Sequence, residues 1–298
     1  MKNRFTLSLI LFLFFAAGCG DAAQKSDGDY ADQMAEQHAE DTPEASPMVQ
    51  AANIPVAVRD VEYARVDGAA VMGYLAEPAN VDSVLQAMGR APGSGLPGVI
   101  VIHEWWGLND NIRAMTRQLA AEGYRALAVD LYGGEAAGTP DGAQALMMAA
   151  MQNPTAAETN LVSAYTYLTN QEHAPTVASI GWCFGGGMSL TTALALPTDL
   201  DAAVIYYGRL VDDRDRLATL EMPIIGFFGR DDGGIPVEGV EAFEATLKDL
   251  GKDAEVHIYD GAGHAFANPS GQNYLEAAAQ DAWSRTRTFL KAHLYGMP

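Results

Sequence analysis

The chain has 298 residues, of which 49% are hydrophobic, and it carries a formal net charge of −20 at pH 7. That length fits one large α/β domain or two smaller ones, and the apolar content is sufficient for a substantial core. The acidic balance excludes a nucleic-acid-binding protein, because few Lys and Arg side chains are present to neutralise phosphates. It also disfavours peripheral binding to anionic lipid surfaces.

The N-terminus predicts an exported protein. A basic start precedes an apolar run over residues 5–17, which is too short to span a bilayer and is typical of a signal-peptide core. The run ends in Ala-Ala-Gly before Cys19, which resembles a bacterial lipobox; the alternative is an ordinary secretory signal with Cys19 incidental. We expect residues 1–18 to be a lipoprotein signal peptide. A lipid on Cys19 would be the only membrane contact, holding the protein in the periplasm or at the cell surface.

Residues 19–52 are rich in Asp and Glu and show no aliphatic periodicity. This composition predicts an acidic, disordered tether between the anchor and the folded domain. A short helix fits residues 31–40, but it would have nothing to bury, and His38 is expected to be exposed. The folded domain is then expected over residues 53–298.

That domain alternates strands with helices. Residues 56–66 and 69–76 alternate apolar and polar positions around an Asp-Gly pair, which predicts a hairpin. Further strands are expected at 98–102, 125–129, 176–180, 202–206, 223–228 and 254–259, and helices at 109–122, 141–151, 155–169, 188–194, 237–250 and 273–294, with 85–97 as a connection. The pattern predicts an α/β fold with a mostly parallel sheet and helices on both faces. Ligands of such sheets bind at the carboxyl ends of the strands.

Residues 181–185 read Gly-Trp-Cys-Phe-Gly between an expected strand and an expected helix. This is the strand–turn–helix pattern of a nucleophile elbow, with Cys183 in the place of serine. The turn is so tight that the residues flanking the nucleophile must be small. The helix N-terminus behind Cys183 would favour a thiolate. The alternative is a buried structural cysteine beside glycines that pack the helix.

Two further residues complete a candidate triad. Asp232 and His264 each follow a later strand, so nucleophile, acid and histidine occur in the chain order of α/β-hydrolases. His264 would pair with the thiolate and later protonate the leaving group, while Asp232 would fix the tautomer of His264. Asp231 is the weaker candidate for the acid. The alternatives are an ordinary Asp-Asp-Gly-Gly turn and a solvated loop histidine.

Three other segments join the elbow in a family resemblance: 103–109 (His-Glu-Trp-Trp-Gly-Leu-Asn), 130–132 (Asp-Leu-Tyr) and 263–269. Together they resemble the dienelactone hydrolase family, from about Val56 to the C-terminus. The resemblance implies an α/β-hydrolase fold and a cysteine hydrolase that cleaves a small ester or lactone through a thioester acyl-enzyme. It also implies that Glu104 contacts the resting thiol and that the backbone N–H groups of Phe184 and Trp105 form the oxyanion hole.

The same resemblance implies that Trp106 and Tyr132 line the pocket. Members of the family that bind anionic lactones carry two arginines, at places occupied here by Gly134 and Asn268. We therefore expect neutral acyl substrates to be preferred. Arg209, at another strand end, is a candidate replacement; the alternative is a solvated loop arginine.

The remaining features point to no cofactor. No two histidines have metal-ligand spacing, so no metal is predicted, and the glycines at 185–187 match no nucleotide-binding motif. His103 is expected behind Glu104, His257 within a strand, and His173 and His293 at the surface.

We expect a monomer. The alternative function is a non-catalytic binding lipoprotein of the same fold; a thiol-redox protein would lack a resolving cysteine.

Overall fold

The computed structural model describes residues 26–44 and 53–297. In this part of the chain an eight-stranded sheet runs in the order β1-β2-β4-β3-β5-β6-β7-β8. β1 and β2 form the antiparallel hairpin and β2 pairs antiparallel with β4, while every other pair is parallel. The predicted α/β fold with a mostly parallel sheet is therefore confirmed. The strands are β1 (Val56–Val66), β2 (Ala69–Pro78), β3 (Gly98–Ile102), β4 (Arg125–Val129), β5 (Val177–Trp182), β6 (Ala202–Tyr206), β7 (Ile224–Gly229) and β8 (Ala254–Tyr259).

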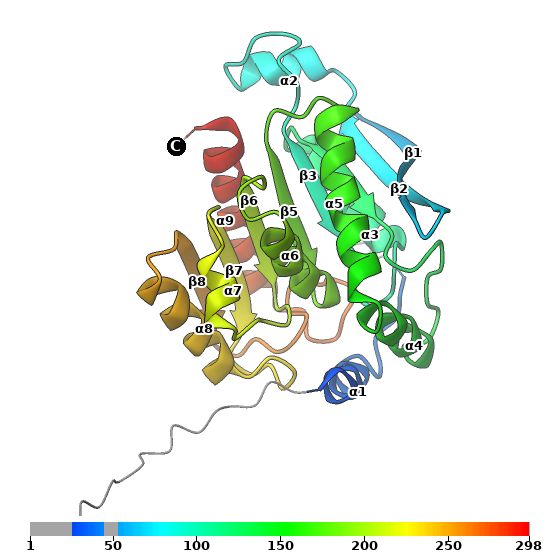
Figure 1. Ribbon diagram of the computed structural model, residues 1–298, viewed down its shortest axis with the longest axis vertical. Helices are drawn as coiled ribbons and strands as arrows, with labels where there is room; N and C mark the ends of the chain where they lie inside the picture. Colours follow the sequence, from blue (N-terminus) through cyan, green and yellow to red (C-terminus); the bar gives the residue numbers. More distant parts are fainter. Residues whose placement is uncertain (1–25, 45–52, 298) are drawn as a thin grey trace, which may run out of the picture.

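Helices cover both faces of the sheet: in Figure 1, α5 and α6 lie in front of it and α9 runs behind it. The helices are α1 (Asp27–Gln37), α2 (Val81–Ala87), α3 (Asp110–Ala121), α4 (Pro140–Met151), α5 (Pro154–Asn170), α6 (Phe184–Ala195), α7 (Arg214–Ala218), α8 (Val237–Asp249) and α9 (Glu276–Tyr295). None of these helices, in the ranges that the structure describes, has the length and apolar character needed to cross a membrane.

The central strands are continuous apolar runs because both of their faces are covered. Every residue of β3, β5, β6 and β7 is buried. α3 begins where the sequence signals it: the Asn109 side chain caps this helix by accepting a hydrogen bond from the N–H of Ile112, at 3.1 Å. The sheet is thus a rigid base for the loops at the carboxyl ends of its strands.

The segment before the hairpin differs from the sequence prediction. Residues 26–44 were expected within a disordered tether, but they contain α1, which packs against α4 (Figure 1). Tyr30, Ala31 and Met34 form a buried stripe on α1. The expectation that such a helix has nothing to bury was wrong, because the hydrolase domain itself is its partner. Cys19 and the predicted signal peptide lie outside the described residues.

Two smaller differences are also local. α2 begins at Val81, ahead of the expected connection, and α7 was not predicted. Both are too short to show a helical period in the sequence. α2 is instead recognisable by its cap, because the Asn80 side chain accepts a hydrogen bond from the N–H of Ser83 at 3.0 Å.

Candidate active site

The elbow joins β5 to α6 at Cys183. Cys183 has φ 55° and ψ −120°, a strained conformation for a residue with a side chain. A Cβ on Gly181 would lie 2.0 Å from the carbonyl oxygen of Gly185, and one on Gly185 would lie 2.3 Å from the carbonyl oxygen of Ile102. Both positions therefore require glycine, and the turn holds the sulfur at the carboxyl end of β5.

His264 and Asp232 form a buried pair beside the elbow. His264 Nδ1 donates to Asp232 Oδ2 at 2.7 Å, and the other carboxylate oxygen accepts from the N–H groups of Gly234 and Ile235 at 2.8 and 2.9 Å. Burial tends to raise the pKa of Asp232, but the charge of His264 and these hydrogen bonds outweigh it and hold that pKa below its usual value. Because Nδ1 is hydrogen-bonded to Asp232, Nε2 is the ring nitrogen of His264 that remains available for proton transfer.

Glu104 lies in the loop after β3 and is almost fully buried. Its carboxylate accepts from Asn268 Nδ2 at 3.0 and 3.2 Å and from Asn111 Nδ2 at 3.5 Å. Burial first, and then the charge of Cys183, raise the pKa of Glu104 to about 7. Asn268 occupies the place where members of the family that bind anionic lactones were expected to have an arginine. In the structure its side-chain amide donates hydrogen bonds to Glu104.

His103 fixes the position of Glu104 from behind. His103 Nδ1 donates to the Glu104 carbonyl oxygen at 2.6 Å, and Nε2 accepts from the N–H of Leu131 at 3.1 Å. The ring is fully buried, which lowers its pKa, and a neutral tautomer with the proton on Nδ1 satisfies both contacts. The imidazole therefore joins the loop after β3 to the loop after β4.

Aromatic side chains surround the elbow. Trp105 and Trp106 meet edge to face with ring centroids 4.9 Å apart, and Tyr132 lies 5.8 Å from Phe184. Trp105 Nε1 and the Tyr132 hydroxyl are buried and make no hydrogen bond to any residue that the structure describes.

The hydroxyl of Tyr207 is likewise buried without a hydrogen bond to any residue that the structure describes. This residue was not predicted from the sequence. The ring of Tyr207 lies 5.3 Å from that of His264, just after β6. Its chain position after a strand was the available signal. Buried polar groups without a partner are unusual in proteins, and a bound substrate is one way to satisfy them.

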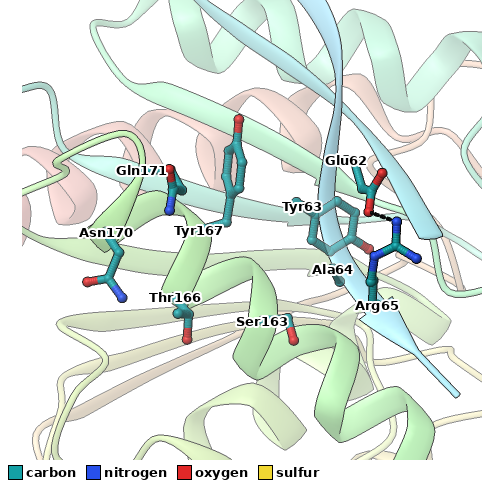
Figure 2. Close-up of a pocket in the computed structure, with 9 residues that line it drawn as sticks. All are labelled: Glu62, Tyr63, Ala64, Arg65, Ser163, Thr166, Tyr167, Asn170 and Gln171. Atoms are coloured by element: carbon teal, nitrogen blue, oxygen red, sulfur yellow. Dashed lines mark ion pairs between the residues drawn. The ribbon is translucent and has the colours of Figure 1, made fainter. Parts of the chain in front are cut away.

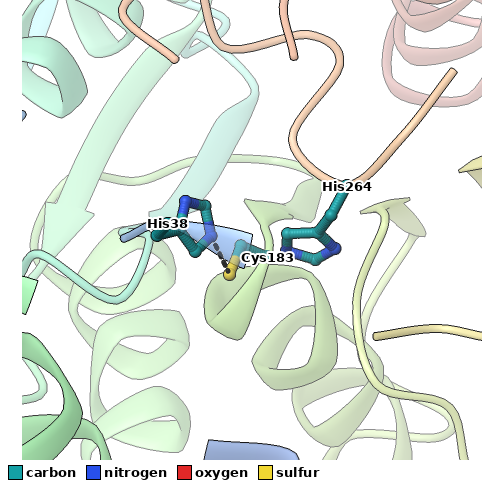
Figure 3. A group of neighbouring side chains, drawn as sticks. All are labelled: His38, Cys183 and His264. Carbon is teal, nitrogen blue, oxygen red and sulfur yellow. Dashed lines mark hydrogen bonds between the residues drawn. The ribbon is translucent and has the colours of Figure 1, made fainter. Parts of the chain in front are cut away.

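The N-terminal segment reaches Cys183. His38 Nε2 lies 3.7 Å and Met34 Sδ 3.8 Å from Cys183 Sγ, and His38 Nδ1 donates to Asp41 Oδ2 at 2.7 Å. Figure 3 shows the sulfur between the rings of His38 and His264. His38 is only 2% exposed, so the prediction of an exposed side chain was wrong. The available signal was the four-residue spacing of Met34 and His38, which puts both on one side of the segment.

The two histidines favour a thiolate. Burial tends to raise the pKa of Cys183, but the charges of the neighbouring His264 and His38 outweigh it and lower that pKa to about 6. Burial tends to lower the pKa of His38, but Asp41 and the sulfur outweigh it and raise that pKa to about 9. The pKa of His264 is raised well above its usual value, because Asp232 and Cys183 outweigh its burial.

Arg209 contacts α1. It forms an ion pair with Asp27, and its guanidinium carbon lies 5.3 Å from the ring centroid of Tyr30. Arg209 was predicted to be a candidate replacement clamp for a substrate carboxylate. In the structure this side chain instead fastens the N-terminal helix to the loop after β6.

One hollow in the described part of the chain lies away from these residues. It has a volume of about 470 Å³ and lies between β1 and α5, where Glu62 and Arg65 form an ion pair across its edge (Figure 2). None of the predicted catalytic residues lines it. The sulfur of Cys183 is fully buried. In this conformation the candidate active site is closed by Met34 and His38.

Comparison with known proteins identifies the family of this chain. The model of the dienelactone hydrolase family matches residues 85–294. The chain is 32% identical over 262 residues to a "Putative carboxymethylenebutenolidase" of Saccharolobus solfataricus, covering 76% of this chain and 95% of that protein. It is 31% identical over 245 residues to a protein of Aquifex pyrophilus named "usf", covering 78% and 98%.

A solved structure extends the likeness to three dimensions. The crystal structure of a "Putative Dienelactone Hydrolase" from Klebsiella pneumoniae aligns with a TM-score of 0.67 and 26% identity, over 82% of this chain and all of that one. The resemblance indicated by the elbow and the loop motifs is therefore confirmed. The chain belongs to the dienelactone hydrolase family and is a hydrolase.

Proposed function

We propose that this protein is a cysteine hydrolase that cleaves a small ester or lactone through a thioester acyl-enzyme on Cys183. The observation that carries the proposal is that Cys183, strained at the elbow, lies beside His264. The Nδ1 atom of His264 is hydrogen-bonded to Asp232 at 2.7 Å. The chemistry in the relative's name, a carboxymethylenebutenolidase, supports a lactone or ester as the substrate.

In the first half-reaction the thiolate attacks the carbonyl carbon of the substrate. The C–S bond forms, and the carbonyl π electrons move to oxygen, giving an oxyanion. Phe184 is the first residue of α6, so its N–H has no acceptor within the helix and is available to this oxyanion, together with the N–H of Trp105. When the carbonyl reforms, the C–O bond breaks and the leaving oxygen takes the Nε2 proton of His264.

In the second half-reaction His264 acts as a base. Its neutral Nε2 accepts a proton from water, whose oxygen attacks the thioester carbonyl. Collapse of the new oxyanion expels the thiolate and releases the carboxylic acid, and the ion pair of thiolate and imidazolium is restored. Asp232 stabilises the imidazolium at both stages through its hydrogen bond to Nδ1.

Glu104 adjusts the charge beside the sulfur. With its pKa raised to about 7, the carboxyl group exchanges a proton near neutral pH. An ionised Glu104 opposes a neighbouring thiolate, whereas a protonated one does not. We infer that Glu104 controls how readily the nucleophile forms and that Asn268 and His103 hold it in place.

Substrate reaches the sulfur only when the side chains of Met34 and His38 move away. The polar attachments of this segment are peripheral: Gln144 donates to Asp32 at 2.8 Å, and the N–H of Gln272 donates to Asp41 at 3.0 Å. Exposed contacts of this kind contribute about 1 kcal/mol or less each. We infer that α1 is a removable cover and that the described conformation is the closed form.

Neutral acyl groups fit this site better than anionic ones. Asn268 carries no charge and is engaged with Glu104 in a contact that does not involve α1, so it offers no carboxylate clamp when the cover moves away; Arg209 is paired with Asp27 while α1 is in place. A substrate carboxylate buried without a cationic partner would incur a desolvation cost of several kcal/mol.

Turnover of p-nitrophenyl acetate by cysteine variants tests the proposal. Cys183→Ala is expected to lose activity by about 1,000-fold or more, and Cys183→Ser to retain a small remnant, because loss of a triad member removes concerted catalysis. Cys19→Ala is the matched control, since the sequence has 2 cysteines and Cys19 belongs to the predicted signal and anchor segment. Wild-type turnover in Cys183→Ala would overturn the assignment. Absence of turnover in every variant, the wild type included, would favour the non-catalytic binding protein.

A further inference from the structure

Four soft or borderline donor atoms meet where α1 covers the elbow. The Cys183 sulfur and one ring nitrogen each of His38 and His264 all lie within 4.8 Å of one another, and Met34 Sδ lies 3.8 Å from the same sulfur (Figure 3). All four side chains are at most 2% exposed. Two of these residues come from the N-terminal segment and two from the hydrolase domain.

Both histidines are oriented in the same way. Each uses Nδ1 to donate to a carboxylate at 2.7 Å, His38 to Asp41 and His264 to Asp232. This arrangement directs the other ring nitrogen at the sulfur and is the usual support of a metal-ligating imidazole. His264 Nε2 is fully buried and has no hydrogen-bond partner among the described residues. Leaving a buried nitrogen unpaired costs free energy, which a ligand at this point would recover.

We propose that Met34, His38, Cys183 and His264 form a binding site for a thiophilic metal ion, Cu⁺ or Zn²⁺, which assembles when α1 closes over the cysteine. Thiolate and thioether sulfur with imidazole nitrogen select these ions, whereas Mg²⁺ and Ca²⁺ require oxygen ligands. A tetrahedral ion with metal–sulfur bonds of about 2.3 Å and metal–nitrogen bonds of about 2.0 Å separates sulfur and nitrogen by about 3.5 Å. The observed separation of Cys183 Sγ and His38 Nε2 is 3.7 Å.

The bound ion would join the two parts of the chain. It takes Cys183 as a thiolate, and any proton on the sulfur goes to solvent. It also occupies the nitrogen of His264 that the hydrolytic cycle needs, so the metal-bound form is closed and inactive. The site was missed in the sequence because its ligands stand at positions 34, 38, 183 and 264, where no local spacing indicates a metal.

Direct metal titration of the full chain tests the site independently of ester turnover. The metal-free protein is titrated with Zn²⁺ or, under reducing conditions, with Cu⁺, each against a chromophoric chelator, and Co²⁺ serves as a spectroscopic probe for thiolate ligation. We expect one ion per chain and a thiolate-to-Co²⁺ charge-transfer band. His38→Ala is expected to weaken binding by about 10-fold or more, and Asp41→Asn, which keeps every donor, by about 10- to 100-fold. His257→Ala, in β8 and outside the cluster, is the control with unchanged affinity.

Two further variants define the donor set. Cys183→Ser should abolish the charge-transfer band, and Met34→Leu should weaken Cu⁺ more than Zn²⁺ because a thioether is a ligand for the softer ion. Circular dichroism of each variant separates loss of a ligand from loss of the fold. Absence of stoichiometric binding of either ion, or unchanged affinity in folded His38→Ala, would overturn the site. Neither outcome changes the ester turnover expected of the metal-free protein. The metal site and the hydrolase function are therefore tested independently.

Discussion

His38 Nε2 lies 3.7 Å from Cys183 Sγ, although 145 positions separate the two residues. This contact links the N-terminal segment to the nucleophile elbow in both geometry and charge. The ring stacks on Trp105 with centroids 4.8 Å apart and donates to Asp41 on its other side. An N-terminal histidine therefore favours the thiolate form of Cys183, and the sulfur contributes to the docking of α1.

The docking of α1 should depend on pH. The pKa of His38 is raised from 6.5 to about 9 in the closed form, because Asp41 and Cys183 favour the charged ring more than burial disfavours it. A raised pKa means that the stabilisation is complete below pH 6.5 and is lost as the pH rises through 9. We expect amide hydrogen exchange over residues 27–41 to accelerate between pH 6.5 and 9, beyond the intrinsic pH dependence of exchange.

His38→Gln supplies the control for that measurement, since a glutamine fills similar space but does not titrate. Its α1 amides should exchange faster than those of the wild type at pH 6.5, and the difference should shrink toward pH 9. A wild type and a variant with the same pH profile would show that His38 does not hold the segment by its charge.

Weakening the attachment of α1 to the hydrolase domain should raise kcat/KM for esters. Asp27 pairs with Arg209 at the start of α1, and both side chains are partly exposed. Asp27→Asn should favour the open form by about 1 kcal/mol or less and so raise kcat/KM by up to about fivefold. Asp281→Asn breaks an ion pair with Arg285 on the surface of α9 and is the matched control. A lower kcat/KM in Asp27→Asn would indicate that α1 assists the reaction instead of obstructing it.

Matched esters with and without a free carboxylate extend this experiment. The increase in kcat/KM caused by Asp27→Asn should be the same for both esters, because α1 in the closed form obstructs both of them equally. The wild type should prefer the neutral ester. If Asp27→Asn improves only the anionic ester, Arg209 binds a substrate carboxylate once it is released from Asp27, and the expected neutral preference is wrong.

Ionisation of Glu104 should destabilise the folded protein. Its pKa rises from 4.5 in the unfolded chain to about 7 in the fold, mainly through burial. The folded state therefore binds the proton more tightly, so stability falls as the pH rises from 4.5 through 7, by about 3 kcal/mol at most. Glu104→Gln mimics the protonated acid and should gain stability over the wild type at pH 8 relative to pH 5. Urea unfolding at the two pH values measures this difference; a constant difference would contradict the raised pKa.

The anchor remains a prediction from the sequence. Ala-Ala-Gly before Cys19, behind a short apolar run, predicts a lipid on that cysteine. Intact-mass analysis of protein from a bacterial membrane fraction should find the diacylglyceryl mass on the wild type and not on Cys19→Ala. Equal lipid masses on both would show that Cys19 is not the lipidated residue, and a chain cleaved elsewhere without lipid would show that the segment is an ordinary secretory signal.

Much of the fold was predictable because it depends on local chemistry. The apolar run of β3 and the Asn109 cap of α3 are readable in short windows, since they reflect burial on two faces and one side-chain hydrogen bond. The requirement for Gly181 and Gly185 follows from the tightness of a single turn.

The parts that escaped prediction depend on contacts between distant segments. Residues 26–44 resemble a disordered acidic linker when considered alone, and only the domain beneath them makes Met34 and His38 interior residues. Asn268 was treated as a missing arginine because its position was compared with a pattern, whereas its hydrogen bond to Glu104 joins two loops that are far apart in the chain. The spacing of Met34 and His38 puts both on one side of the segment, but it does not say what that side packs against, and no spacing indicates the contact of Asn268 with Glu104.

Trapping the acyl-enzyme tests the central claim most directly. The chain is mixed with p-nitrophenyl acetate, quenched in acid within the first turnover, and analysed by intact mass and peptide mapping. We predict one acetyl group per chain, located on Cys183 and removed by neutral hydroxylamine, as a thioester is. A burst of nitrophenol with no adduct on Cys183, or an adduct on another residue that persists in Cys183→Ala, would contradict the account.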